Sequence, residues 1–128
     1  GEFTYASAGM NTSPLILRAD GKVDVLESDG FPICKFGPHY KPYYESRTAH
    51  LNPGDTLILY TDGLLEIDPR RSYRFSQEQL VQFIVGLKDV TAQEICDEIS
   101  DAYHALRGEE EMTDDVTILV VKTGNTDT

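Results

Sequence analysis

The stretch that most constrains the fold of this chain is residues 52–66, which read NPGDTLILYTDGLLE. The turn signal at residues 52–55 ends whatever precedes it. Residues 57–60 form an apolar run too short, and too closely flanked by chain-breaking residues, to be anything but a buried strand. Asp62 follows this strand, and the next residue, Gly63, can adopt a positive φ that bends the backbone sharply. We therefore expect the Asp62 carboxylate to project past the edge of a sheet, as a metal ligand would.

The composition sets limits on the partners of such a carboxylate. The chain has 128 residues, of which 40% are hydrophobic and 26% are charged, which suits one soluble domain with a modest core. Its 22 acidic and 11 basic residues give a formal net charge of -11. Nucleic acids and anionic membranes bind basic faces, so we expect neither as a partner. The acidic excess predicts a solvated surface, as in a cytoplasmic protein.

Cys34 and Cys96 are the two cysteines of the chain, and they lie far apart in the sequence. Neither belongs to a CxxC pair or has a histidine at ligand spacing, so we expect reduced thiols and neither zinc nor redox chemistry. No apolar run approaches the ~20 residues that a bilayer-spanning helix needs. The N-terminus also lacks a signal-peptide pattern. We therefore expect no targeting or anchoring segment.

The first part of the sequence predicts strands. Residues 3–9 read as an apolar-rich strand that ends at a glycine. Residues 15–17 and 23–26 predict the two arms of a hairpin, because the turn between them, at residues 19–22, contains the Asp-Gly signal. These segments predict an antiparallel arrangement at the start of the chain.

A loop and a further strand follow. Glycines and prolines interrupt residues 28–42, which predict a long surface loop. Residues 43–51 contain residue types suited to a sheet and predict a strand. Because residues 52–54 form a turn, we expect this strand to pair antiparallel with the central strand at residues 57–60.

The hydrophobic period changes after the acidic turn. Residues 76–87 and 91–106 place apolar side chains at helical spacing, and each segment opens with a capping-box signature, at Ser76 and at Thr91. Gly108 stands where it would end the second helix. We expect the apolar stripes of both helices to pack on a sheet, with a partner-binding surface as the alternative.

A second pair of carboxylates precedes the last strand. Asp114 and Asp115 close an acidic run and lead directly into the apolar residues 116–121. Together with Asp62 they form two carboxylate clusters at strand ends, which suits Mg²⁺ or Mn²⁺ because these ions take oxygen ligands. The spacing leaves open that the aspartates only bend and cap the backbone in turns.

Three motifs in this order resemble those of the bacterial SpoIIE/RsbU-type serine phosphatases of the metal-dependent PP2C superfamily. They are YASAG at residues 5–9, GDTLILYTDGLLE at residues 54–66 and DDVT at residues 114–117. The resemblance implies an α+β fold in which antiparallel β-sheets are covered by two helices, as part of a PP2C-like α-β-β-α sandwich. Residues 1–128 would be the C-terminal portion of this phosphatase domain, without its first metal-binding segment.

The same resemblance implies a function in bacterial signal transduction. Members of this family are metal-dependent protein serine/threonine phosphatases, and two Mn²⁺ or Mg²⁺ ions in the complete domain would activate water for the attack on phosphorus. The expected substrate is a phosphoserine or phosphothreonine on a regulatory partner, such as a STAS-domain anti-anti-sigma factor in sigma-factor regulation. A sensory or receiver domain is expected upstream in the native chain, and the expected location is cytoplasmic.

The family pattern assigns the metal ligands. Asp62 would bind a metal through its carboxylate, Gly63 through its backbone carbonyl or a water, and Asp114 would be the second carboxylate ligand. Asp115 stands at a position that is often Asn elsewhere in the superfamily, and its expected role is to shape the loop. No catalytic side chain beyond the metal-bound water is implied.

Other polar side chains give weaker signals. Arg70 and Arg71, just beyond the acidic turn, could hold a substrate phosphate, or they could form a solvated loop pair. His39, His50 and His104 are expected to be surface or structural residues rather than bases.

Two departures from the family pattern bear on activity. Met10 stands where the family usually has His, and a thioether does not bind hard metals. The first metal-binding segment is expected before residue 1, so we expect the 128-residue chain alone to bind Mn²⁺ weakly and to hydrolyse phosphate esters poorly or not at all. The alternative function is a degenerate, non-catalytic phosphatase-like binding module in a partner-switching pathway. We also expect bare apolar sheet surface that a homodimer would cover.

Overall fold

The structure is a computed structural model that describes residues 1–35, 37–65, 76–109 and 115–124. The elements of these residues, in chain order, are β1 (Glu2–Ala6), β2 (Leu15–Leu17), β3 (Val23–Val25), β4 (Ser46–His50), β5 (Thr56–Tyr60), the 3₁₀ helix η1 (Asp62–Leu64), α1 (Gln77–Val85), α2 (Ala92–Arg107) and β6 (Ile118–Lys122).

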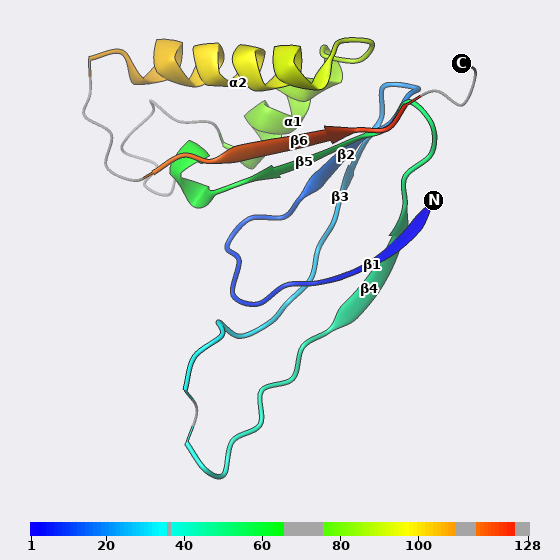
Figure 1. The fold of residues 1–128 in the computed structure, drawn as a ribbon. Helices are drawn as coiled ribbons and strands as arrows, with labels where there is room; N and C mark the ends of the chain where they lie inside the picture. Colours follow the sequence, from blue (N-terminus) through cyan, green and yellow to red (C-terminus); the bar gives the residue numbers. More distant parts are fainter. Residues whose placement is uncertain (36, 66–75, 110–114, 125–128) are drawn as a thin grey trace.

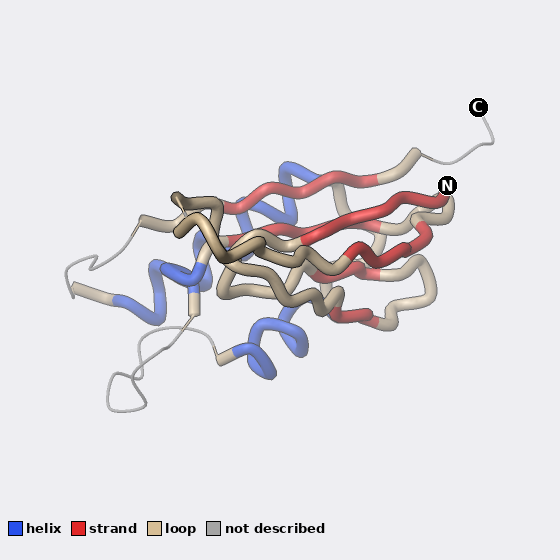
Figure 2. Tube along the Cα trace, turned by 90° about the horizontal axis from the view of Figure 1, so that it is seen from below, coloured by secondary structure: helices blue, strands red, loops and turns tan. Residues whose placement is uncertain are grey.

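The described elements form three layers. Four strands make an antiparallel sheet in the order β3-β2-β5-β6, and α1 and α2 lie over one of its faces (Figure 1). β1 and β4 pair antiparallel with each other and form a two-stranded sheet on the other side (Figure 2). The expected α+β fold, with antiparallel sheets and two covering helices, is confirmed.

Side chains of β5 point alternately to the two faces of the sheet, so this strand contacts both the helices and the β1–β4 sheet. Ile58 and Tyr60 are buried among apolar side chains of α1 and α2, whereas Leu57 packs with Phe3 and Ala49 of the β1–β4 sheet. Successive strand residues point to opposite faces, so a short apolar strand can belong to two cores. The helix side of the main core contains Leu80, Ile84, Ile95, Ile99 and Tyr103.

Both helices begin at the capping boxes that the sequence predicts. The Ser76 hydroxyl accepts from the Gln79 backbone N–H at 3.1 Å, and the Gln79 side chain accepts from the Ser76 N–H at 3.0 Å. Thr91 and Glu94 make the same reciprocal pair at 3.1 and 2.9 Å. Gly108 ends α2 with a φ of 60°, which is a conformation that glycine adopts readily. The β2–β3 hairpin is also as predicted, and so is the irregular connection within residues 28–35 and 37–42.

The pairing that we expected between residues 43–51 and the central strand is wrong. β4 pairs with β1, from Glu2 opposite His50 to Ala6 opposite Ser46, and β5 pairs with β2 and β6. The turn at residues 52–55 therefore carries the chain from one sheet to the other. Its geometry is fixed by the Asp55 N–H, which donates to the Asn52 carbonyl at 3.0 Å. A tight turn is compatible with a corner between sheets as well as with a hairpin.

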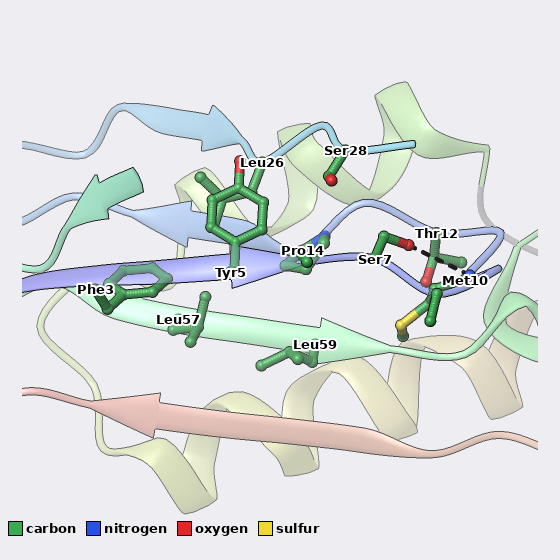
Figure 3. A pocket seen from close by; sticks show the side chains of 12 residues that line it. Phe3, Tyr5, Ser7, Met10, Thr12, Pro14, Leu26, Ser28, Leu57 and Leu59 are labelled. Atoms are coloured by element: carbon green, nitrogen blue, oxygen red, sulfur yellow. Dashed lines mark hydrogen bonds between the residues drawn. The ribbon is translucent and has the colours of Figure 1, made fainter. Parts of the chain in front are cut away.

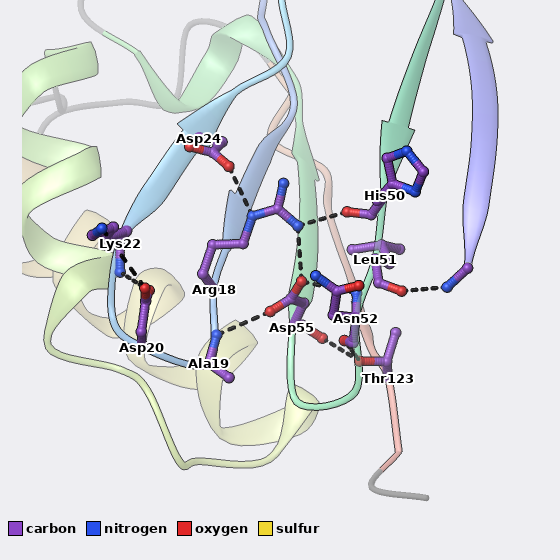
Figure 4. A network of polar contacts seen from close by, with 11 residues as sticks. Arg18, Ala19, Asp20, Lys22, Asp24, His50, Leu51, Asn52, Asp55 and Thr123 are labelled. Carbon is purple, nitrogen blue, oxygen red and sulfur yellow. Dashed lines mark hydrogen bonds and ion pairs between the residues drawn. The ribbon is translucent and has the colours of Figure 1, made fainter.

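The Asp55 carboxylate connects the two sheets at this corner (Figure 4). Its side chain is 3% exposed and pairs with Arg18 at 2.8 Å, and it accepts the backbone N–H groups of Ala19 and Asn52, each at 2.9 Å. The same guanidinium donates to the His50 carbonyl of β4 at 2.6 Å. Burial alone would raise the pKa of Asp55, but the hydrogen bonds and charge of Arg18 and the two backbone donors outweigh it and lower the pKa.

The sheet face that points away from the helices is only partly covered. Between it and the β1–β4 sheet lies a cavity of about 500 Å³, whose lining includes Phe3, Tyr5, Leu26, Leu57 and Leu59 (Figure 3). Leu119 and Val121 of β6 lie opposite Leu59 and Leu57 and are 55% and 44% exposed. The described residues thus present the bare apolar sheet surface that we expected.

Both cysteines are free thiols, Cys34 exposed and Cys96 half-buried. Among the described helices, none combines the length and apolar character needed to cross a membrane.

Candidate metal centre

The candidate centre forms where β5 leaves the sheet. Thr61 follows the strand, and Asp62 is the first residue of η1. The Leu64 N–H donates to the Thr61 carbonyl at 3.2 Å, and the Leu65 N–H donates to the Asp62 carbonyl at 3.0 Å. This 3₁₀ turn makes the bend, and Gly63 does not adopt a positive φ. Asp62 therefore stands at the end of the central strand β5, where the sequence predicts a sharp bend, although a different backbone conformation makes this bend.

A loop from the start of the chain reaches the same place. The Asn11 side-chain amide donates to the Asp62 carboxylate at 3.3 Å. The next residue, Thr12, is buried, and its hydroxyl donates to the Tyr60 carbonyl at 2.6 Å. The connection between β1 and β2 is thereby attached to the end of β5, next to the candidate ligand.

The segment before β6 lies on the opposite side of Thr61. The Thr61 hydroxyl donates to the Asp115 carbonyl at 3.2 Å and accepts from the Thr117 N–H at 2.9 Å. The Thr61 N–H also donates to the Thr117 carbonyl at 3.0 Å. The two motifs that carry the predicted carboxylates are therefore side by side, although residues 62 and 115 are far apart in the sequence.

The described residues include part of the predicted site. Asp62 is half-buried, Gly63 is buried within η1, and Asp115 is exposed. Asp114, Arg70 and Arg71 lie outside the described residues, so their assignment as a ligand and as substrate-binding residues stays a prediction. The Asp115 backbone carbonyl accepts from the Thr61 hydroxyl, and the expected loop-shaping role of Asp115 stays a prediction.

Sequence reasoning missed Asn11, Thr12 and Thr61. Their importance comes from contacts with segments that are distant in the chain, and a local pattern gives only a weak signal of such contacts. The signal that could have found Asn11 and Thr12 is a polar pair shortly before a buried strand. For Thr61, it is a hydroxyl residue between a strand and an acidic turn.

The three histidines and Met10 are the remaining residues that the sequence singled out. His39, His50 and His104 are exposed, as expected for surface residues. Met10 is 44% exposed and lines the apolar cavity between the sheets, where a thioether packs well (Figure 3).

The Asp62 carboxylate has the properties of a ligand for a hard cation. It is partly exposed, and none of the ion pairs formed by the described residues involves it. Carboxylate oxygens are the usual protein ligands of Mg²⁺ and Mn²⁺. Within residues 1–35, 37–65, 76–109 and 115–124, His, Cys, Asp and Glu do not gather in threes around one point, so a two-ion centre would need ligands from outside these ranges.

Comparisons with known proteins agree on one family. The family described as Stage II sporulation protein E (SpoIIE) matches residues 1–124. Phosphoserine phosphatase RsbU of Bacillus subtilis (strain 168) is 27% identical over 121 residues, which are 94% of this chain and 35% of the relative. The chain thus spans about a third of the length of this relative.

Solved structures give the same result. The RsbU and RsbW domains of a Mycobacterium tuberculosis protein match with a TM-score of 0.65 and 29% identity, over 97% of this chain and 33% of that one. The PP2C phosphatase domain of SpoIIE from Bacillus subtilis, solved with a fragment of its regulatory domain, matches with a TM-score of 0.72 over 94% of this chain and 34% of that one. Its 22% identity supports the fold alone. The chain belongs to the family described as Stage II sporulation protein E (SpoIIE), and its fold is that of the solved PP2C phosphatase domain that it matches.

Proposed function

We propose that this chain supplies the Asp62 part of the metal centre of a protein serine/threonine phosphatase. The observation that carries the proposal is the meeting of three segments at the end of β5. Asn11 contacts the Asp62 carboxylate, and Thr61 joins the same strand end to Asp115 and Thr117. Family membership supports the reaction class, since the related RsbU is named a phosphoserine phosphatase.

The residues of the chain would divide the work as follows. Asp62 would bind a metal through its carboxylate and Asp114 would supply a second carboxylate, while Gly63 would contribute its backbone carbonyl or a water. Asp115 would shape the loop through its carbonyl contact with Thr61. When bound, two Mn²⁺ or Mg²⁺ ions would supply an activated water and neutralise charge on the phosphoryl group.

The ions are proposed from the donor chemistry and from relatives. Oxygen donors at the end of β5 suit either ion. A Bacillus subtilis SpoIIE phosphatase domain was solved after presoaking with Mn, and RsbX was solved in complex with magnesium. Asp62 would hold such an ion at the sheet edge, where η1 leaves its carboxylate partly exposed.

The proposed substrate is a phosphoserine or phosphothreonine of a regulatory protein in a bacterial partner-switching pathway, such as a STAS-like anti-anti-sigma factor. Support comes from the RsbU relative and from the match to RsbU and RsbW domains. Arg70 and Arg71 remain candidate phosphate-binding residues. A cytoplasmic location, with a sensory or receiver domain joined to this one, would suit this function.

The test compares variants of the intact native protein in Mn²⁺-dependent hydrolysis of p-nitrophenyl phosphate and of a phosphoserine peptide. We expect Asp62→Asn to lower kcat/KM by about 100-fold or more, because changing a ligand should cost at least as much as the 10–100-fold typical of changes to outer-shell partners. Asp101→Asn, an equal charge change at an exposed position of α2, should leave the rate unchanged.

Equal rates for Asp62→Asn and the wild type would contradict the proposal. A wild-type protein that binds its phosphorylated partner but shows no Mn²⁺-dependent hydrolysis would instead identify the non-catalytic binding module. The 128-residue polypeptide alone is a separate case. Asp62 and Asp114 supply too few carboxylates for two ions, so we expect it to bind Mn²⁺ weakly and to turn over slowly, as calorimetry and the same assay would show.

A further inference from the structure

Thr61 ends the ladder between β5 and β6 in an unusual way. The register places Tyr60 opposite Ile118, so Thr61 lies opposite Thr117. The Thr61 N–H donates to the Thr117 carbonyl at 3.0 Å, which is one of the two bonds that such an antiparallel pair exchanges. The second bond would run from the Thr117 N–H to the Thr61 carbonyl.

The Thr61 carbonyl instead accepts from the Leu64 N–H at 3.2 Å, because the chain turns into η1 directly after the strand. The Thr61 hydroxyl takes its place and accepts from the Thr117 N–H at 2.9 Å. Its own proton goes to the Asp115 carbonyl at 3.2 Å. One side chain thus makes two backbone contacts, and β5 can bend away at Asp62 without releasing residues 115–117.

We propose that Thr61 is a positioning residue of the metal centre. Its hydroxyl holds residues 115–117 against the strand end that carries Asp62, and so fixes the position of this segment relative to Asp62. This inference rests on the proposed function of Asp62. Groups that orient metal ligands typically contribute 10–100-fold to metal affinity or activity.

The attachment of the β1–β2 connection strengthens the argument. Thr12 fixes this connection to the Tyr60 carbonyl at 2.6 Å, and Asn11 reaches the Asp62 carboxylate at 3.3 Å. The end of β5 that carries Asp62 is therefore attached to the β1–β2 connection and, through Thr61, to residues 115–117. A loss of the hydroxyl should loosen residues 115–117, although the Thr61 N–H still donates to the Thr117 carbonyl, while the Asn11 side stays in place.

Two variants of the intact protein distinguish the contribution of the Thr61 hydroxyl from that of its methyl group. Thr61→Val keeps the shape and removes the hydroxyl, and Thr61→Ser keeps the hydroxyl and removes the methyl group. We expect Thr61→Val to weaken Mn²⁺ binding, measured from the EPR signal of free Mn²⁺, by about 10-fold or more. Thr61→Ser should stay within about threefold of the wild type, well inside the range of an orienting group.

A second readout uses no metal. Hydrogen exchange of the Thr117 amide in the metal-free protein should accelerate in Thr61→Val, because its acceptor is gone, and should remain slow in Thr61→Ser. If Thr61→Val does not fold, the Thr61→Ser variant still tests the inference. Loss of either Mn²⁺ affinity or Thr117 protection in a folded Thr61→Ser protein would overturn the inference.

Asp62→Asn distinguishes a failure of this inference from a failure of the proposed function. If Asp62→Asn loses Mn²⁺ affinity and Thr61→Val does not, Thr61 is not a positioning residue, while the assignment of Asp62 stands. If Asp62→Asn binds Mn²⁺ as the wild type does, the proposed metal site is wrong and the inference fails with it.

Discussion

At the scale of single residues, Asp55 and Asp62 show how position decides what an aspartate does. Both belong to the segment of residues 52–66: Asp55 closes a turn, and Asp62 comes shortly after the end of β5. Asp55 is buried and its carboxylate is bound by Arg18 and by two backbone N–H groups, whereas Asp62 is partly exposed with a long contact to Asn11. A carboxylate bound on several sides stabilises a corner of the fold, and a carboxylate that is partly exposed among the described residues can bind a cation.

Asp55→Asn should destabilise the protein by about 2–3 kcal/mol, because it leaves a partly buried guanidinium without its main partner. Arg18 is 23% exposed and keeps Asp24, which limits the cost. Urea unfolding at pH 7 measures the difference. Asp24→Asn is the control, because this carboxylate of the same network is 54% exposed and should cost less than about 1 kcal/mol.

The stability difference between the wild type and Asp55→Asn should also depend on pH. The pKa of Asp55 is lowered in the folded state, so its contribution to stability is present above the unfolded pKa of about 3.9 and is lost as the pH falls through the folded value. The stability difference between wild type and Asp55→Asn should therefore shrink below about pH 4. A difference that grows with acidification would contradict this assignment.

At the scale of elements, local signals predicted well and non-local pairing did not. The capping boxes, the β2–β3 hairpin and the position of β5 depend on residues that are close in sequence, and the structure confirms each. The pairing of β4 with β1 joins residues that are 40 to 48 positions apart. The turn signal at residues 52–55 fits either a hairpin or a corner, so the sequence could not distinguish them.

The candidate site likewise contains one residue that a local sequence pattern predicts and others whose roles depend on distant contacts. Asp62 could be predicted because a carboxylate after an apolar strand is a local pattern. Asn11 and Thr61 could not, because their roles come from contacts with Asp62, Asp115 and Thr117 that exist only in the folded chain.

The cap of α2 provides the prediction at this scale. Thr91→Ala removes the acceptor of the Glu94 N–H and should lower the free energy of unfolding by about 1 kcal/mol. Gln93→Ala is the matched control, since this exposed side chain makes an i,i+4 contact with Asp97 worth only tenths of a kcal/mol. Chemical denaturation of the intact protein measures both, and equal effects would show that the cap is not the source of stability.

At the scale of the whole molecule, the three layers of described residues leave one sheet face only partly covered. Apolar patches of this kind on an edge strand favour association. We expect the 128-residue polypeptide to self-associate at high concentration, with β6 in the contact. Leu119→Lys should shift light scattering toward the monomer, whereas Leu106→Lys, at a comparably exposed position of α2, should not. A wild-type polypeptide that stays monomeric at high concentration would contradict this expectation.

The central claim is that Asp62 binds a metal ion where β5 leaves the sheet. The measurement that tests it most directly is anomalous diffraction at the manganese edge from crystals of the intact protein soaked in Mn²⁺. We predict a peak on the order of 2 Å from the Asp62 carboxylate, on the side of residues 115–117. Bound Mn²⁺ at another place, with no peak at Asp62, would contradict the claim.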